Sequence, residues 1–188
     1  MSARLFFALE LPERVRADLA AWGRAAAEAD EALRPVGRDA LHVTLAFLGH
    51  RAVDEIEPLA EMARAAAAPV PDLSLGAALW LSPRRPHVLT VAVADPTGTL
   101  SRVQAAVAAG AAEAVGFVEE RRRFRPHVTA ARVRHRALPR RTGVPEPPSA
   151  SFAGEALTLF RSHLGGRGPA RYEALERVAL GDGERRRA

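Results

Sequence analysis

The feature of this sequence that most constrains its fold is a duplication. A predicted strand, a helix that begins near Pro12 and a strand that carries His-Val-Thr at 42–44 form one unit. The same order recurs with a helix near Pro96 and a second His-Val-Thr at 127–129, and the proline-to-histidine spacings are 30 and 31 residues. Two copies of one strand–helix–strand unit predict two similar lobes that face each other about a pseudo-twofold axis.

Hydrophobic periodicity divides the rest of the chain into strands and helices. The predicted strands are 4–11, 41–49, 72–81, 87–94, 125–133, 152–161 and 171–180, and the predicted helices are 13–30, 53–68 and 95–116. We therefore expect an α/β (α+β) fold that is bilobal, with a mostly antiparallel sheet and helices in each lobe and a central cleft between the lobes. Residues 1–180 are expected to form a single bilobal domain, followed by a flexible tail at 181–188.

The amino-acid composition limits which kinds of ligand the protein is expected to bind and in which cellular compartment it is expected. The 188-residue chain contains no cysteine, which excludes disulfides and thiolate metal sites. We find no signal peptide and no membrane span in the sequence, and we expect a cytoplasmic monomer. The formal net charge is +5 and every basic residue is arginine. Because the planar guanidinium suits phosphate oxygens, this composition is compatible with an RNA or nucleotide ligand.

The two His-Val-Thr motifs carry the candidate chemistry. Alternate residues of a strand share a face at a Cα separation of about 6.5–7 Å, so His42 lies beside Thr44 and His127 beside Thr129. Two imidazoles across a cleft can act as an acid–base pair near neutral pH. The hydroxyls can donate to phosphate oxygens, and nearby arginines add charge. This set suits in-line displacement at phosphorus without a metal.

Simpler explanations exist for each part of this pattern. A single His-x-Thr on a strand is ordinarily a hydrogen-bonded structural histidine beside a strand-favouring threonine; two copies at matching places favour a site. Two imidazoles with no carboxylate beside either motif are too few for a metal centre, so we predict no metal and no cofactor. The remaining histidines are expected to be solvated or structural: His50, His87, His135 and His163.

The flanks of the motifs resemble the 2H phosphoesterase superfamily, specifically the bacterial and archaeal RNA 2′,3′-cyclic phosphodiesterase family, once called 2′-5′ RNA ligases. The resemblance covers nearly the whole chain, through RLFFALELP, LHVTLAFLG, FRPHVTAARV and LTLFRSHLGGRGPARYEAL. It implies a bilobal α/β fold with both His–Thr pairs in a central, metal-independent cleft. It also implies an RNA 2′,3′-cyclic 3′-phosphodiesterase that hydrolyses 2′,3′-cyclic phosphate ends to 2′-phosphates.

The resemblance also implies roles for individual residues. By analogy His42 is the proton donor to the leaving 3′ oxygen, and His127 is the proton acceptor that activates water. Thr44 and Thr129 would hold phosphate oxygens. Arg132 matches the arginine that closes the second motif of the family and would contact phosphate. Strand parity places Arg132 opposite His127, so reaching the cleft requires a bulge or a strand end.

The wall of the pocket is harder to assign. Phe7 and Phe47 are candidates for a surface on which a base stacks, but parity places Phe47 on the core face and we assign it to the core. Many relatives have arginine and tryptophan where this chain has His87 and Thr90, which leaves base recognition open.

Several alternatives for function remain at this point. The partners are expected to be RNA ends or nucleoside cyclic phosphates, and not a membrane. Ligation that forms a 2′-5′ bond would be the same displacement with an RNA hydroxyl in place of water. The substrate could instead be another small cyclic nucleotide, a 2′-5′ oligonucleotide or a nucleotide-sugar cyclic phosphate. A non-catalytic RNA-binding module is the alternative from another class.

Overall fold

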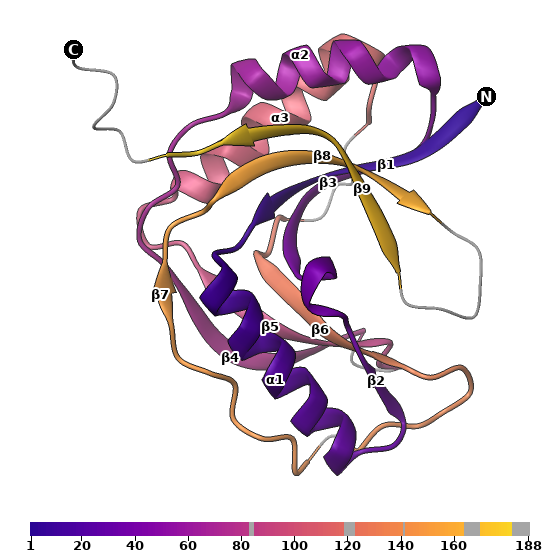
Figure 1. Ribbon diagram of the computed structural model, residues 1–188, viewed down its shortest axis with the longest axis vertical. Coiled ribbons are helices and arrows are strands. Elements are labelled where there is room, and N and C mark those ends of the chain that lie inside the picture. The colour runs from indigo at the N-terminus through magenta and orange to yellow at the C-terminus, as the bar shows by residue number, and fades with distance from the viewer. Residues whose placement is uncertain (83–84, 119–122, 141, 164–169, 182–188) are drawn as a thin grey trace.

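Nine strands in the described part of the chain form one curled antiparallel sheet, which three α-helices cover (Figure 1). The computed structural model describes residues 1–82, 85–118, 123–140, 142–163 and 170–181. The helices are α1 (Glu13–Ala29), α2 (Ile56–Ala66) and α3 (Thr99–Val115), with 3₁₀ turns η1 (Arg38–Ala40) and η2 (Val53–Glu55). The strands are β1 (Ser2–Glu10), β2 (Leu33–Pro35), β3 (His42–Ala52), β4 (Leu73–Leu81), β5 (Val88–Ala94), β6 (His127–Val133), β7 (Ser151–Phe152), β8 (Ala156–His163) and β9 (Arg171–Ala179). Except for Gly181, the expected flexible tail lies outside the described residues.

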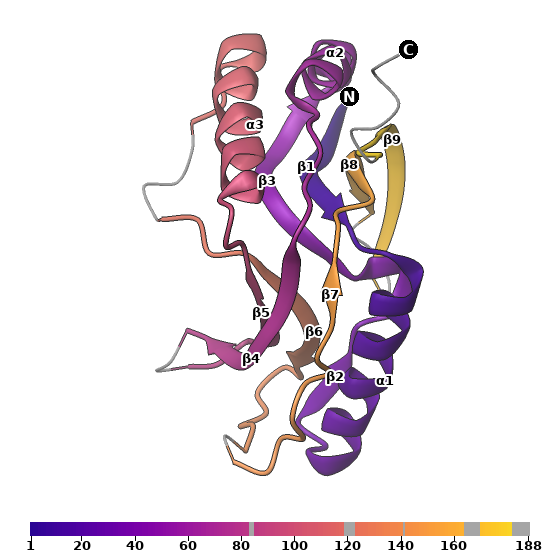
Figure 2. The same ribbon diagram turned by 90° about the vertical axis from the view of Figure 1, so that its left-hand side faces the viewer.

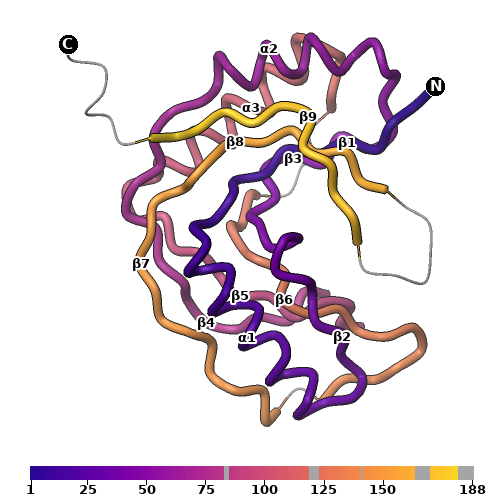
Figure 3. The backbone as a smooth tube through the Cα atoms, viewed as in Figure 1, coloured from indigo at the N-terminus to yellow at the C-terminus, as the bar shows by residue number. Residues whose placement is uncertain are grey.

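The strand order is β7-β4-β5-β6-β3-β1-β8-β9, and β2 pairs with the free part of β6. The two halves of the sheet meet at the β3–β6 pair, where Val43 lies opposite Val128. Each motif strand is therefore central, and the sheet curls around the pair, as the tube in Figure 3 shows. The predicted fold class is confirmed, and the structure adds that the sheets of the two lobes are continuous.

The register of the strands confirms the duplication. Thr44 of β3 lies opposite Ala8 of β1, and Thr129 of β6 lies opposite Thr90 of β5. β5 thus pairs with β6 in the second unit as β1 pairs with β3 in the first. This equivalence puts the two His-Val-Thr segments on adjacent, antiparallel strands at the centre of the molecule.

The helices are exchanged between the two units. α1 follows β1 in the chain but packs against β2 and β6, whereas α3 follows β5 but packs against β3 and α2 (Figures 1 and 2). The predicted apolar stripe of α1 is buried, with Val15, Leu19 and Trp22 each at most 5% exposed. Burying such a side chain stabilises the fold by about 1.5–3 kcal/mol. The exchange therefore ties the two halves together through their helices.

Two local details differ from the predicted boundaries. The sequence does not predict β2, because a three-residue strand that contains Pro35 is too short for a period-two pattern. α2 begins at Ile56 rather than at residue 53, which places Pro58 in the first turn, where its missing N–H costs little. No helix within the described ranges is long and apolar enough to cross a membrane.

Candidate active site

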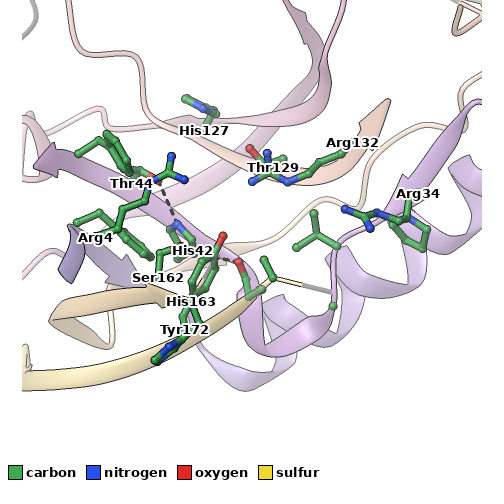
Figure 4. A pocket seen from close by; sticks show the side chains of 17 residues that line it. Arg4, Arg34, His42, Thr44, His127, Thr129, Arg132, Ser162, His163 and Tyr172 are labelled. Atoms are coloured by element: carbon green, nitrogen blue, oxygen red, sulfur yellow. Dashed lines mark hydrogen bonds between the residues drawn. The ribbon is translucent and has the colours of Figure 1, made fainter. Parts of the chain in front are cut away.

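A cavity of about 480 Å³ opens between the central strands and the β8–β9 hairpin. All the predicted site residues line it: His42, Thr44, His127, Thr129 and Arg132. Figure 4 shows both His–Thr pairs facing the same space from β3 and β6. The two motifs, 85 residues apart in the chain, form one site because Val43 and Val128 are paired between them.

Both histidines are held in the same tautomer. His42 Nδ1 donates to the carbonyl oxygen of Ala40 at 2.9 Å, and His127 Nδ1 donates to that of Arg125 at 2.7 Å. A carbonyl only accepts, so the proton lies on Nδ1 in each ring and Nε2 is left for chemistry. His42 Nε2 accepts a hydrogen bond from Thr44 Oγ1 at 3.1 Å.

The surroundings of His42 make the two histidines inequivalent. The rings of Phe6 and Tyr172 lie 5.0 and 5.4 Å from the His42 ring, centroid to centroid. Burial lowers the pKa of His42 from 6.5 to about 4; the hydrogen bond to Ala40 opposes this shift, and the charges of Arg132 and His127 add to it. His42 is therefore neutral at neutral pH in the empty cleft. The aromatic enclosure comes from β1, β8 and β9, and His127 makes no ring contact among the described residues.

Arg132 reaches the cavity because β6 contains a bulge. Thr129 and Ala131 lie opposite consecutive residues of β5, so Ala130 between them has no partner there. Ala130 and Ala131 are both buried, which reverses the parity of the strand and turns Arg132 to the side of Thr129. The bulge that the sequence requires for Arg132 is confirmed.

The first motif contains the same irregularity, which overturns one prediction. Thr44 and Ala46 lie opposite consecutive residues of β1, so Leu45 is the extra residue. Leu45 and Ala46 are both buried, and Phe47 turns to the cavity with 48% of its surface exposed. The assignment of Phe47 to the core is therefore wrong. Phe47 occupies the place in its motif that Arg132 occupies in the other, five residues after the histidine.

Sequence reasoning missed several residues of the cavity. Arg4 and Arg34 line it, and the Arg4 guanidinium lies 4.7 Å from the centre of the Phe47 ring. His163 and Tyr172 enter from the β8–β9 hairpin, where His163 Nε2 lies 2.8 Å from Glu173 Oε2. These four residues reach the cavity through pairing between strands that are far apart in the chain. Sequence patterns do not show which strands pair, so they give no signal for these residues.

The two positions at which this chain differs from many relatives, His87 and Thr90, lie outside the cavity lining. His87 is exposed, and neither His87 nor Thr90 is among the described residues that line the cavity. Thr90 is fully buried and its hydroxyl donates to the carbonyl oxygen of Leu79 at 3.0 Å. The Thr90 side chain therefore stabilises the pairing of β4 with β5.

The bulge in β6 is braced by α1, which leads to a prediction on stability. A Cβ on Gly23 would lie 2.8 Å from the carbonyl oxygen of Ala130, a backbone atom that cannot move away freely. We expect Gly23→Ala to destabilise the protein by about 1–2 kcal/mol in urea unfolding, because overpacking outweighs the better helix propensity of alanine. Gly37→Ala is the control: its φ is −64° and nothing lies within 4 Å, so it should be neutral or slightly stabilising. Equal stability of the two variants would contradict the bracing.

The lowered pKa of His42 predicts a dependence of stability on pH. Between about pH 6.5 and 4 the unfolded chain binds a proton at this residue and the folded protein does not. The free energy of unfolding should therefore fall as the pH is lowered through this window, by up to about 1.4 kcal/mol per pH unit more than in His42→Gln. Tyr172→Ala should shrink this excess, because it opens the ring to water. Urea titrations across the window measure the effect, and parallel curves for wild type and His42→Gln would refute it.

Comparisons with known proteins agree with this geometry. A family model described as the 2′-5′ RNA ligase superfamily matches residues 10–166. The RNA 2′,3′-cyclic phosphodiesterase of Escherichia coli is 35% identical over 179 residues, which cover 94% of this chain and 96% of the relative. The protein of the same name from Thermus thermophilus is 31% identical over 189 residues, covering 94% and 90% of the two chains.

A solved structure gives the same result for the fold. The crystal structure of E. coli LigT complexed with 3′-AMP has a TM-score of 0.76 and 31% sequence identity, and the match covers 97% of this chain and 100% of that one. The family match spans both His-Val-Thr motifs and every strand from β2 to β8. On these grounds, the chain belongs to the 2′-5′ RNA ligase superfamily.

Proposed function

We propose that this protein is an RNA 2′,3′-cyclic 3′-phosphodiesterase that opens the cyclic phosphate to a 2′-phosphate by paired-histidine acid–base catalysis, without a metal. The observation that carries the proposal is the convergence of both His–Thr pairs and Arg132 on one cavity. The names of the curated relatives support this class of substrate.

In the proposed reaction His127 Nε2 takes a proton from water, whose oxygen attacks phosphorus. The bond between phosphorus and the 3′ oxygen breaks, and His42 Nε2–H protonates that oxygen. The product carries a 2′-phosphate and a free 3′ hydroxyl. Thr44, Thr129 and Arg132 stabilise the charge that builds up on the non-bridging oxygens.

The donor role of His42 depends on the substrate. In the empty cleft His42 is neutral, because burial and the charge of Arg132 lower its pKa. A bound phosphate brings a negative charge to the ring and offsets the field of Arg132. Both changes favour the protonated imidazole. Substrate binding would therefore favour the protonated form of His42, which is the acid that the reaction requires.

The remaining features of the substrate follow from the walls of the cavity. The exposed ring of Phe47, backed by the Arg4 guanidinium, offers a flat face on which a base would stack. All these groups come from one chain, which supports a monomer acting on RNA ends or nucleoside cyclic phosphates. The exchanged helices support a single bilobal domain over 1–180, and the cysteine-free sequence fits a cytoplasmic location.

A substrate panel tests this function. Purified protein in EDTA is incubated with adenosine 2′,3′-cyclic phosphate, adenosine 3′,5′-cyclic phosphate, a 2′-5′ oligoadenylate and a nucleotide-sugar cyclic phosphate. We expect rapid opening of the 2′,3′-cyclic phosphate alone. Turnover of another member in its place would reassign the substrate, and salt-sensitive RNA binding without any turnover would favour a binding module.

A further inference from the structure

We propose that Arg34 forms a second phosphate subsite beside the catalytic one, which takes the phosphate on the 5′ side of the terminal ribose. The catalytic subsite at Arg132 holds the cyclic phosphate. Arg34 lines the same cavity from β2 and has no part in the chemistry described above. The identity of the terminal nucleotide rests on the proposed function, whereas the presence of the subsite is tested separately below.

The register of β2 places the two arginines together. Arg34 lies directly opposite Arg132 in the antiparallel β2–β6 pair. Residues opposite each other in such a pair have Cβ atoms about 4.5–5.5 Å apart and share a face of the sheet. Figure 4 shows both side chains at the same end of the cavity, with Arg34 beyond Arg132. A ligand phosphate at Arg132 therefore has Arg34 as its next cationic neighbour.

β2 is held firmly although it has only three residues. Leu33 is fully buried. On either side of the strand, the N–H of Val36 donates to the carbonyl oxygen of Ala130 and the N–H of Arg134 donates to that of Ala32, each at 2.8 Å. The backbone that carries Arg34 is thus tied to the same bulge that orients Arg132. The backbone positions from which the two arginine side chains extend are therefore fixed relative to each other.

The charges of the cavity exceed what a cyclic phosphate supplies. Arg4, Arg34 and Arg132 line it, and no carboxylate does so within the described residues. Like charges directly opposite each other on a sheet destabilise it. No ion pair of Arg34 or Arg132 occurs in the part of the chain that the structure describes. A cyclic phosphodiester carries one negative charge, so the pair has a positive charge left over that a second anion would compensate.

The arrangement along the cavity selects the 5′ phosphate as this anion. Arg4 and Thr44 lie at one end in Figure 4, and Arg34 lies at the other, past Arg132. With the base on Phe47 at the first end, the ribose spans the centre. The 5′ oxygen and the rest of the RNA strand then leave toward Arg34. The subsite would favour an RNA end over a mononucleotide that lacks a 5′ phosphate.

Two substrates and one matched control test this subsite. The ratio of kcat/KM for adenosine 2′,3′-cyclic phosphate with and without a 5′ phosphate is measured in wild type, Arg34→Gln and Arg24→Gln. Arg24 is an exposed arginine of α1 that does not line the cavity. We expect the 5′ phosphate to raise kcat/KM about tenfold in wild type, mainly through KM, because a charge-assisted hydrogen bond is gained. Arg34→Gln should abolish this ratio and Arg24→Gln should keep it.

A binding measurement separates the subsite from the reaction. Calorimetry compares adenosine 2′-monophosphate with adenosine 2′,5′-bisphosphate on the same three proteins. Loss of the bisphosphate advantage only in Arg34→Gln supports the subsite, even if cyclic phosphates are not hydrolysed and the proposed function fails. An equal loss of affinity for both ligands would place Arg34 at the catalytic phosphate, and unchanged affinities for both ligands would show that Arg34 contacts no phosphate. Either result overturns the inference.

Discussion

Replacing either His42 or His127 with alanine is expected to lower kcat/KM for a nucleoside 2′,3′-cyclic phosphate by about 10²–10⁴-fold. Both imidazoles donate from Nδ1 to a backbone carbonyl and present Nε2 to the cavity. No other described side chain that lines the cavity has this arrangement. The rates are measured by chromatography of the product. His50→Ala is the matched control, because His50 lies on β3 with His42 but is exposed and outside the cavity lining. Full activity in either alanine variant would contradict the mechanism.

The division of labour between the two histidines can be tested with an activated leaving group. A nucleoside 2′-phosphate esterified with p-nitrophenol loses a stable phenolate and needs little help from an acid. We expect His42→Ala to lose much less activity on this diester than on the cyclic phosphate, whereas His127→Ala should lose as much on both. The reverse pattern would exchange the roles of donor and acceptor.

Replacing Arg132 with alanine is expected to lower kcat/KM by about 10²–10³-fold, because a cation aimed at the charge of the transition state is lost. Arg132→Lys should recover only part of the activity, since an ammonium lacks the fork that matches phosphate oxygens. Arg132→Ala should also change the pKa of His42. Arg132 lowers the pKa of His42, so the pKa of His42 in the free protein, followed by NMR titration, should rise in Arg132→Ala.

The control for this prediction is Arg134→Ala. Arg134 is two residues further along, and its Nε donates to the carbonyl oxygen of Glu31, outside the cavity lining. Its loss should leave both the rate and the pKa of His42 unchanged. A similar loss in the two variants would mean that general positive charge, rather than the position that the bulge gives to Arg132, accounts for the effect.

The sequence predicts that the two His–Thr pairs share one cavity because the pairs are duplicated. His42 and His127 stand out only through each other, and the match of their surroundings leads to two facing units, which the register of β1–β3 and β5–β6 confirms. The bulges are harder to foresee, since parity assumes an unbroken strand. Two consecutive small or apolar residues follow each threonine, Leu45-Ala46 and Ala130-Ala131. This break in alternation is the signal that would have placed Phe47 correctly.

The walls of the site lie beyond what local patterns predict. Tyr172 encloses His42 because β9 pairs with β8 and β8 with β1, a chain of contacts between segments far apart in the sequence. Arg34 joins Arg132 through a three-residue strand that has no periodic signature of its own. Long-range pairing therefore decides which histidine is buried and where the second phosphate would lie.

The most direct test of the central claim is phosphorus NMR of the reaction of the wild-type protein with adenosine 2′,3′-cyclic phosphate in the presence of EDTA. Protonation of the 3′ oxygen by one histidine and attack by water activated by the other predict a single product, the 2′-phosphate. His42→Ala and His127→Ala should each leave the cyclic phosphate intact over the same time. Formation of the 3′-phosphate, or an unchanged spectrum with wild-type protein, would contradict the account.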